Sequence, residues 1–496
     1  MDENMKYSKV VIGLLESWEQ SRIVYCHWKS IEHLDATYQA KTDIDVLVGR
    51  EDAAKAIEEA LKTGFVEVTS SHFRGYPAVR DFICYDDELD NWVHLHFHTQ
   101  LSCGDRWVKA YHLPFEKFIL ESRVWLESYK TWIIAPSYEL LVLIYRMNAK
   151  FRKNWLKDDR ILAEIKFINK KHERYPVQIG NEIMDYVDRD KWWLYEALLH
   201  GNISVVNISF LRKGFRISEF RRMTSGRFFF FSKLRYLYRI YSEVRRRFFE
   251  IYKSGRRTFP GGGYVVAFVG IDGSGKSSGI ERITKFFAKQ MNVQTNFLGS
   301  GKSGAGLIRK LIMNIVGFKA SSKGHKEVRK AGGNENVAKS DLPRPPLHYV
   351  LWIMLCTLDR EKQLKKIQYG LGNGNLVFVD RWLQDDRLDS VDAPRLANYK
   401  KFKGIVGYVA RREAKLYKKI KLIPLHLVIK LNIDAETSIK RKPGELSYTQ
   451  ASDAIEKLNI LKWPKEAKIM EIDGTDSLQN VTVNLKKAIF QLLQEK

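Results

Sequence analysis

Cysteine is scarce in this sequence. Its 496 residues include four cysteines, Cys26, Cys84, Cys103 and Cys356, and no two of them are spaced as a Cys-x-x-Cys pair. Thiols placed in this way form no disulfide framework, which excludes the disulfide-rich secreted class of protein. We therefore expect the protein to work in a reducing compartment.

Long apolar runs are absent as well. No segment offers about 20 uninterrupted apolar residues, which is the length that a membrane-spanning helix needs. The N-terminal stretch "MDENMKYSKVVIGLLESWEQ" starts with acidic residues and carries charges within its apolar part, unlike a secretory signal peptide. The sequence thus predicts a cytoplasmic protein without a membrane span.

Acidic residues are few relative to basic ones. The chain has 58 Asp and Glu against 83 Lys and Arg, which makes a net charge of +25. Such a charge favours contact with a polyanion, either a nucleic acid, an anionic membrane surface or nucleotide substrates. With 45% hydrophobic residues the composition is otherwise that of a globular protein, and the length predicts two or three domains.

Three regions that differ in sequence pattern follow one another along the chain. Residues 1–130 combine predicted strands with a helix and are expected to form a mixed α/β domain. Residues 131–258 have a helical pattern and end within "GRRTFPGGG" (255–263), which has the composition of a linker. In residues 259–496 strands and helices alternate, which is typical of an α/β fold with a parallel sheet covered by helices.

The stretch "AFVGIDGSGKSSGIERI" (267–283) carries the most specific motif. A short apolar run breaks into glycines and a lysine and then continues at helical spacing, so the glycines lie at a strand-to-helix turn. The spacing matches G-x-x-x-x-G-K-[ST], the phosphate-binding loop, better than an ordinary glycine turn. Glycine lets backbone N–H groups turn toward an anion, and the helix N-terminus adds partial positive charge. The residues expected to bind ATP are Gly270, Asp272, Gly273, Ser274, Gly275, Lys276, Ser277 and Ser278.

Two side chains of this loop have chemical roles, and a third lies on a later strand. Lys276 is expected to reach the β- and γ-phosphates, and the Ser277 hydroxyl is expected to bind Mg²⁺. A second apolar run, "NGNLVFVDRW" (373–382), ends in Asp380, a pattern that places a carboxylate near Mg²⁺ at the C-terminal edge of a parallel sheet. We therefore expect ATP and Mg²⁺ as cofactors, with Ser277 and Asp380 as metal ligands.

The loop "GIDGSGKSS" and the later "VDRW" together resemble the thymidylate kinase family. In that family the Arg of the Asp-Arg pair grips the acceptor phosphate, and the Asp supports catalysis near the metal. The resemblance therefore implies catalytic roles for Lys276, Asp380 and Arg381.

Two further segments are similar to parts of the same family. A basic segment after a late strand forms the family's lid over the nucleotide phosphates, and here that segment is Lys440, Arg441 and Lys442. The resemblance makes Arg441 a catalytic residue, because a guanidinium stabilises the spread charge of a transferred phosphoryl group, and the alternative is a solvated charge on a surface helix. The segment "IDGT" (472–475) resembles the one that lies beside the adenine.

After Asp380-Arg381 the sequence departs from that family, which continues with small residues and a Tyr-Gln pair that hold the pyrimidine. Here the chain reads "DRWLQDDRLDSVDAP", and its acids suit hydrogen bonds from hydroxyls better than a second nucleotide phosphate. These acids are Asp385, Asp386 and Asp389. The acceptor therefore stays open between a nucleotide and a sugar or glycan precursor. We interpret "NFLGSGKSGAGLIRK" (296–310) as a mobile substrate loop with Lys302, against the alternative of a plain flexible loop.

The first region holds a second motif. "CHWKSIEHLDATYQAKTDIDVLVG" (26–49) places Lys29-Ser30 on a turn and Asp43-Ile44-Asp45 on a later strand. Alternation puts Asp43 and Asp45 on one face, where the two carboxylates can hold a divalent metal ion together. This spacing resembles nucleotidyltransferases of the polymerase-β type, although Lys29 replaces the first glycine of their turn. The resemblance implies their fold and a metal that orients a triphosphate.

The third metal carboxylate of that family is missing from the strand expected to carry it. "WVHLHFH" offers His94, His96 and His98, which share one face. They predict either an imidazole metal site of a softer kind or a half-exposed strand with its histidines outward. Catalytic activity of this region stays open, and the two halves of the chain together resemble fused proteins from bacterial surface-polysaccharide gene clusters.

Basic and aromatic residues interleave at helical spacing near the end of the middle region, in residues 216–257. Such a helix is typical of attachment to an anionic membrane surface, here the inner face of the cell membrane. Packing against a neighbouring domain is the second interpretation, and nucleic acid is the least favoured partner. The basic residues expected at the membrane are Arg221, Arg222, Lys233, Arg235, Arg239, Arg245, Arg246 and Arg247. The aromatic anchors are Phe228 to Phe231, Tyr236, Tyr238, Phe248 and Phe249.

Two functions remain open from the sequence. The first is an ATP- and Mg²⁺-dependent P-loop kinase that phosphorylates a nucleotide or a glycan precursor. The second is an ATP-binding regulatory or scaffold protein of surface-polysaccharide assembly. The Asp380-Arg381 pair favours the enzyme, because a switch has no need to hold a second substrate. The sequence leaves the oligomeric state open.

Overall fold

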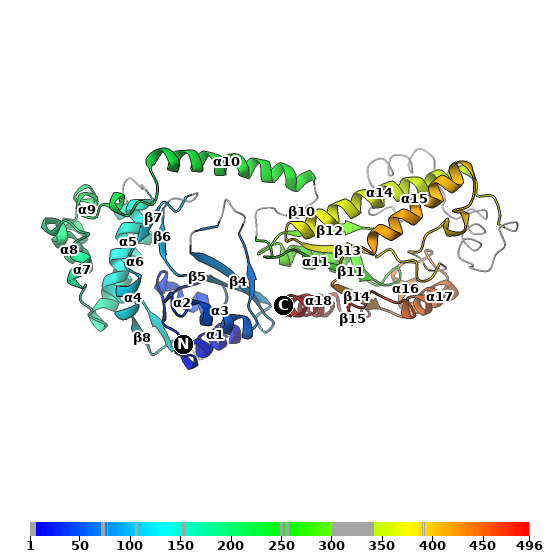
Figure 1. The fold of residues 1–496 in the computed structure, drawn as a ribbon. Coiled ribbons are helices and arrows are strands. Elements are labelled where there is room, and N and C mark those ends of the chain that lie inside the picture. The colour runs from blue at the N-terminus through cyan, green and yellow to red at the C-terminus, as the bar shows by residue number, and fades with distance from the viewer. Residues whose placement is uncertain are drawn as a thin grey trace. The chain divides into compact units, whose positions relative to one another are not determined.

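The computed structural model describes the chain in two compact units, Met1–Glu243 and Val244–Lys496 (Figure 1). The described residues are 6–70, 75–76, 78–104, 108–150, 155–248, 251–252, 257–299, 342–388, 390 and 392–495. Lys302, most of the loop 296–310, Asp389 and Phe249 lie outside them. The division of the sequence at residues 130 and 258 stays a prediction.

The first unit is built on a mixed sheet of seven strands in the order β3-β4-β5-β2-β1-β9-β8. β2 and β5 run parallel, and β4 and β5 form an antiparallel hairpin. The mixed α/β prediction for this region is therefore confirmed. The strands are β1 (Tyr25–His27), β2 (Ile44–Val48), β3 (Val66–Val68), β4 (Val79–Asp86), β5 (Asn91–His98), β8 (Val124–Leu126) and β9 (Thr131–Ile133), with β6 (Leu101–Cys103) and β7 (Tyr111–Leu113) in a separate pair.

Helices make up the remainder of this unit. They are α1 (Lys9–Gln20), α2 (Leu34–Tyr38), α3 (Ala53–Lys62), α4 (Glu116–Glu121), α5 (Pro136–Ala149), α6 (Asp159–Arg174), α7 (Asn181–Met184), α8 (Trp192–Leu199) and α9 (Ile208–Gly214), and α10 (Ser225–Phe248) continues into the second unit. The side chain of Ser8 caps α1, and Trp18 on its buried face donates to the Ala56 carbonyl of α3. Nearly every residue of α5 is buried, as expected for a helix whose centre is the apolar run 140–145.

The second unit has a sheet of six strands in the order β10-β12-β13-β11-β14-β15. All neighbouring pairs are parallel except β10 and β12 at one edge. Every residue of β11 is buried, as expected for a strand covered on both faces. The strands are β10 (Ile251–Tyr252), β11 (Tyr264–Val269), β12 (Val293–Phe297), β13 (Leu376–Asp380), β14 (Leu427–Asn432) and β15 (Lys468–Asp473).

Helices cover both faces of this parallel sheet, which confirms the predicted fold class (Figure 1). They are α11 (Lys276–Phe287), α14 (Leu347–Gly372), α15 (Gly404–Ile420), α16 (Ala435–Arg441), α17 (Tyr448–Asn459) and α18 (Leu478–Gln494). Val265 and Val377 share one core with residues of α14 and α15, whereas Phe378 packs edge-to-face on Phe287 of α11. The chain thus leaves neighbouring strands β11 and β13 toward opposite faces of the sheet. In parallel α/β sheets such a point opens a crevice at the carboxyl ends of the strands.

The basic, aromatic segment forms α10 over Ser225–Phe248. Its side chains include large apolar groups on the surface, with exposed fractions of 61% for Phe229 and Phe230 and 60% for Leu237. Among the described residues, no helix combines the length and apolar character that crossing a bilayer requires. All four cysteines are buried free thiols.

Candidate functional site

The glycines of the phosphate-binding loop are required by its geometry. Gly270, Gly273 and Gly275 have φ angles of +154°, +86° and +89°, which L side chains rarely adopt. A Cβ on Gly270 would lie 2.6 Å from Ser274 Oγ and 2.7 Å from the Leu431 carbonyl oxygen, so the turn also packs tightly against β14. The loop therefore connects β11 to α11 with its backbone free of side-chain obstruction.

Lys276 lies inside this loop, and its side chain is buried. Nζ donates hydrogen bonds to the carbonyl oxygens of Gly270 and Ile271, each at 2.8 Å, and to Ser274 Oγ at 3.2 Å. Burial, aided by the charge of Arg381, lowers the pKa of Lys276 to about 8. The ammonium is thus held at the turn between β11 and α11 by oxygens of the loop itself.

Asp380 ends β13 beside the start of α11, because β13 pairs with β11 in parallel register. The Ser277 hydroxyl donates to Asp380 Oδ2 at 2.9 Å, while Ser277 and Ser278 are exposed on the first turn of α11. Asp380 Oδ1 is buried and has no hydrogen-bond partner among the described residues. A hydroxyl beside a carboxylate with an unpaired oxygen fits Mg²⁺, which prefers hard oxygen ligands.

Arg381 lies between the phosphate-binding loop and the segment after β13. Its guanidinium contacts the Asp272 carboxylate and lies 3.8 Å from Asp392 Oδ2. Burial alone would lower the pKa of Arg381, but the charges of Asp392, Asp272 and Asp380 raise it above its usual value. The residue also has a φ of +69°, and its N–H donates to the Phe268 carbonyl oxygen. Strained backbone of this kind is often found at functional sites.

The structure brings Arg441 to the loop but leaves the other two basic residues of the segment at the surface. At the end of α16, Arg441 Nη1 donates to the Gly474 carbonyl oxygen at 2.7 Å and to the Gly273 carbonyl oxygen at 3.4 Å. Arg441 is therefore engaged with the loop rather than simply solvated. Lys440 is exposed, and Lys442 pairs with Glu445 at 3.0 Å. The segment "IDGT" contributes Gly474, whose Cβ position lies 3.0 Å from the Ser274 carbonyl oxygen.

Two of the three acidic residues that were expected to meet acceptor hydroxyls have partners within the unit. Asp385 pairs with Lys421 at 2.7 Å, and Asp386 accepts from the backbone N–H of Lys462 at 3.3 Å. The carboxylates beside Arg381 are instead Asp272 and Asp392, a role that the sequence analysis missed. Both aspartates lie within the quoted motif sequences. Asp272 and Arg381 are 109 residues apart, however, and no local spacing rule connects them.

A second cluster lies on the sheet of the first unit. The register places Asp45 of β2 and Asp81 of β4 on either side of His96 in the central strand β5. His96 Nδ1 lies 3.0 Å from Asp45 Oδ1, and His96 Nε2 lies 3.2 Å from Asp81 Oδ1. Lys29 Nζ pairs with Asp45 Oδ1 at 2.8 Å, so the Lys29 ammonium neutralises this aspartate.

The three histidines do not face outward from a half-exposed strand, so that alternative is wrong. His94 and His98 are buried, with exposed fractions of 3% and 5%. Burial lowers the pKa of His98 to about 4. Burial would lower the pKa of His96 too, but hydrogen bonds to Asp45 and Asp81 raise it to about 9. Burial opposes the ionised form of Asp43, yet its hydrogen bond from His94 holds its pKa below the usual value.

Asp81 is the functional candidate that the sequence analysis of this region missed. The missing carboxylate was sought on the strand of His94, His96 and His98, whereas Asp81 comes from the preceding strand of the hairpin. A signal for Asp81 was present in the alternating polar and apolar residues of the two strands, "RDFICYD" and "NWVHLHFH". Because opposed residues of an antiparallel pair share a face, the hairpin register places Asp81 with His96.

No family model matches the sequence. The chain is similar to two Escherichia coli strain K12 proteins described as uncharacterized ATP-binding proteins. YghR is 28% identical over 229 residues, which are 45% of this chain and 86% of the relative. YghS is 26% identical over 233 residues, which are 46% of this chain and 93% of the relative. Among solved structures, thymidylate kinase from Candida albicans is similar over 47% of the present chain and 94% of the kinase chain. The TM-score is 0.26 and the sequence identity is 17%.

Proposed function

We propose that the second unit binds ATP with Mg²⁺ and transfers the γ-phosphoryl group to an acceptor, as a P-loop kinase. The observation that carries this proposal is the convergence of Lys276, Ser277, Asp380 and Arg381 at the carboxyl ends of β11 and β13. The names of the two Escherichia coli relatives support ATP as the nucleotide.

Each of these residues has a physical task in such a reaction. The loop N–H groups and the Lys276 ammonium hold the β- and γ-phosphates, where negative charge spreads in the transition state. The Ser277 hydroxyl and the Asp380 carboxylate hold Mg²⁺, which neutralises charge on the phosphate oxygens. Arg441, at the loop next to Gly273 and Gly474, supplies a second cation on the donor side.

The environment of Arg381 favours an acceptor that brings hydroxyl groups. Asp272 and Asp392 already balance its charge, and an acceptor phosphate would have to compete with both carboxylates. A sugar or glycan hydroxyl can instead donate hydrogen bonds to them while the guanidinium positions the acceptor. A nucleotide acceptor remains the second candidate within the same proposal.

The experiment that tests this function uses the purified full chain with labelled ATP and Mg²⁺. We expect label to appear on one of two acceptor pools, nucleoside monophosphates or sugars and glycans, and the Asp272–Arg381–Asp392 arrangement favours the second pool. Binding of ATP without transfer to either pool would contradict the kinase and support the regulatory or scaffold function.

Three further assignments are proposals for this chain. Residues 1–130 are a nucleotidyltransferase-like domain of the polymerase-β type, either active or degenerate, supported by the mixed sheet and by Asp43 and Asp45 at β2. Residues 131–258 and 259–496 form the helical region and the kinase domain. The whole protein acts in surface-polysaccharide biosynthesis.

We also propose that α10 attaches the protein to the inner face of the cell membrane. Exposed Phe229, Phe230 and Leu237 lie on the same helix as exposed Lys233 and Arg239. Each basic residue near an anionic surface contributes about 1 kcal/mol, and the apolar side chains add anchoring that salt does not screen.

The full chain is therefore expected to co-sediment with anionic liposomes, less so at high salt, and to bind neutral liposomes little. Replacing Phe229 and Phe230 together with serine should weaken the binding that persists at high salt. Leu422→Ser is the matched control. Leu422 is an apolar residue that is 81% exposed, but it follows α15 and is not part of α10. Absence of binding to both liposome types would rule out membrane attachment.

A further inference from the structure

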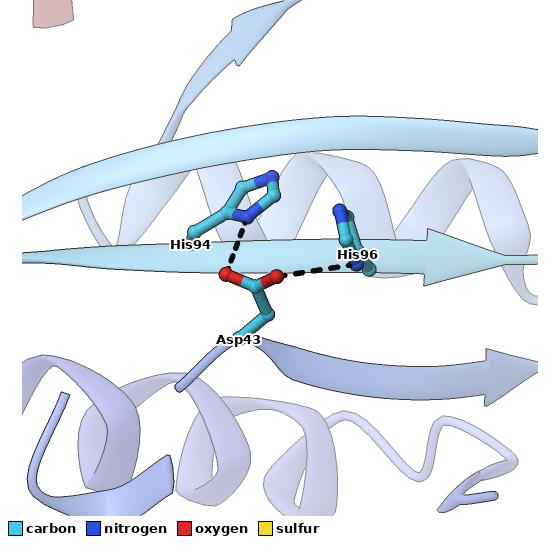
Figure 2. Close-up of side chains that lie close together, drawn as sticks. All are labelled: Asp43, His94 and His96. Carbon is cyan, nitrogen blue, oxygen red and sulfur yellow. Dashed lines mark hydrogen bonds and ion pairs between the residues drawn. The ribbon is translucent and has the colours of Figure 1, made fainter. Parts of the chain in front are cut away.

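Asp43, His94 and His96 bring three potential metal-ligand atoms together at the sheet of the first unit. Figure 2 shows both imidazoles turning the same ring nitrogen, Nδ1, toward the Asp43 carboxylate. His94 Nδ1 lies 2.8 Å from Asp43 Oδ1, and His96 Nδ1 lies 3.7 Å from Asp43 Oδ2. The three ligand atoms lie within 4.8 Å of one another.

Asp81 orients both rings from the opposite side. Its Oδ1 lies 2.9 Å from His94 Nε2 and 3.2 Å from His96 Nε2, and its Oδ2 accepts from Ser70 Oγ at 3.1 Å. A carboxylate oxygen only accepts hydrogen bonds, so when a metal ion replaces the proton on Nδ1, the Nε2–H of each ring still donates to Asp81. The Nδ1 lone pair that the ion then uses faces Asp43 in His94, whereas His96 Nδ1 lies between Asp45 Oδ1 at 3.0 Å and Asp43 Oδ2 at 3.7 Å. A carboxylate behind each ligating histidine is the usual outer support of a metal site.

We propose that Asp43, His94 and His96 bind a divalent first-row transition metal ion such as Zn²⁺, with Asp81 as the residue that positions both imidazoles. Two imidazoles and one carboxylate suit such an ion, whereas Mg²⁺ and Ca²⁺ prefer oxygen ligands alone. Two ligands about 2.1 Å from one tetrahedral ion are about 3.4 Å apart. The distances of 2.8 Å and 3.7 Å from the Asp43 oxygens lie on either side of that value.

The burial of the three ligands defines how the ion enters. The Asp43 side chain is 45% exposed, while that of His94 is 3% exposed. The ion therefore enters from the side of Asp43 and keeps a coordination position open toward solvent, as catalytic rather than structural metal sites do. The site rests on the geometry of the first unit alone and is independent of the proposed phosphotransferase function.

A second ligand set, Asp45, His96 and His98, shares one histidine with the first. His98 is buried, and its Nε2 lies 3.6 Å from Asp45 Oδ1. Asp45, however, already pairs with the Lys29 ammonium at 2.8 Å. A cation that binds Asp45 would have to displace this charge, so the ion is assigned to Asp43.

The test uses the full chain, stripped of metal with a chelator and then titrated separately with Zn²⁺ and Co²⁺. We expect one ion per chain, visible Co²⁺ absorption bands from mixed nitrogen and oxygen ligands, and no displacement by a 100-fold excess of Mg²⁺. Asp43→Asn and His96→Gln should abolish stoichiometric binding. Asp81→Asn should weaken it by about 10- to 100-fold, the usual effect of losing an outer-shell partner.

His33→Gln is the matched control, because His33 belongs to the same unit and its side chain is 62% exposed. If the histidine variants fail to fold by circular dichroism, Asp43→Asn decides alone, since its half-exposed side chain tolerates replacement. The proposal is overturned if the native chain binds no stoichiometric Zn²⁺ or Co²⁺, or if Mg²⁺ competes on equal terms. It is overturned as well if Asp45→Asn removes binding while Asp43→Asn retains it, because the ion then belongs to the second set.

Discussion

Lys276→Ala is expected to abolish phosphoryl transfer from ATP while the second unit stays folded. The ammonium lies among the Gly270, Ile271 and Ser274 oxygens at the centre of the loop, and in the proposed function it stabilises charge on the β- and γ-phosphates. Removing one preorganised group of this kind lowers kcat by about 10²- to 10³-fold. The measurement is the steady-state rate with saturating ATP, together with the melting temperature of the variant.

The expected effect of Lys276→Ala on the free energy of unfolding depends on the burial of the lysine side chain. A loop position indicates a surface side chain, but Lys276 is buried, and its burial lowers its pKa to about 8. Removal of a charge that burial already disfavours should change the free energy of unfolding by about 1 kcal/mol or less. Lys285→Ala is the matched control on the same helix, because Lys285 is exposed and pairs with Glu281 one turn earlier in α11. Near-normal turnover by Lys276→Ala would show that the site is wrongly assigned.

Arg381→Ala is expected to reduce use of the acceptor far more than binding of ATP. The guanidinium is held by Asp272 and Asp392 beside the end of β13, and in the proposed function it orients the second substrate. Its loss should lower kcat/KM for the acceptor by about 100-fold or more, since charge-assisted hydrogen bonds to a reacting group are among the strong ones. ATP affinity, measured by calorimetry, should change by less than about 10-fold.

Two further variants serve as comparisons for Arg381→Ala. Arg381→Lys keeps the charge but loses the planar fork of donors, so it should restore only part of the acceptor use. Arg412→Ala is the control for a lost arginine ion pair, because Arg412 pairs with Glu361 on the neighbouring helix α14 at 2.7 Å. Loss of ATP binding with unchanged acceptor affinity would assign Arg381 to the donor side instead.

Local spacing was sufficient to predict the secondary structure around the candidate nucleotide site. The apolar run before Gly270 forms β11, Lys276 begins α11, and Asp380 ends β13, as the sequence predicts. These features depend on neighbours in the chain. A buried strand needs apolar residues, a tight turn needs glycine, and a helix N-terminus follows within a few residues. The alternation of strands and helices likewise predicted the parallel sheet of the second unit.

The partners of the site residues could be found only in the tertiary structure. Asp272 contacts Arg381 from the phosphate-binding loop, Asp385 is paired with Lys421, and Asp81 joins His94 and His96 through the register of a hairpin. Sequence periodicity tells which face a side chain occupies, but not which distant strand lies beside it. Strand order and register are decided by the burial of the whole sheet against its helices, because a shift of one residue would turn every side chain to the other face.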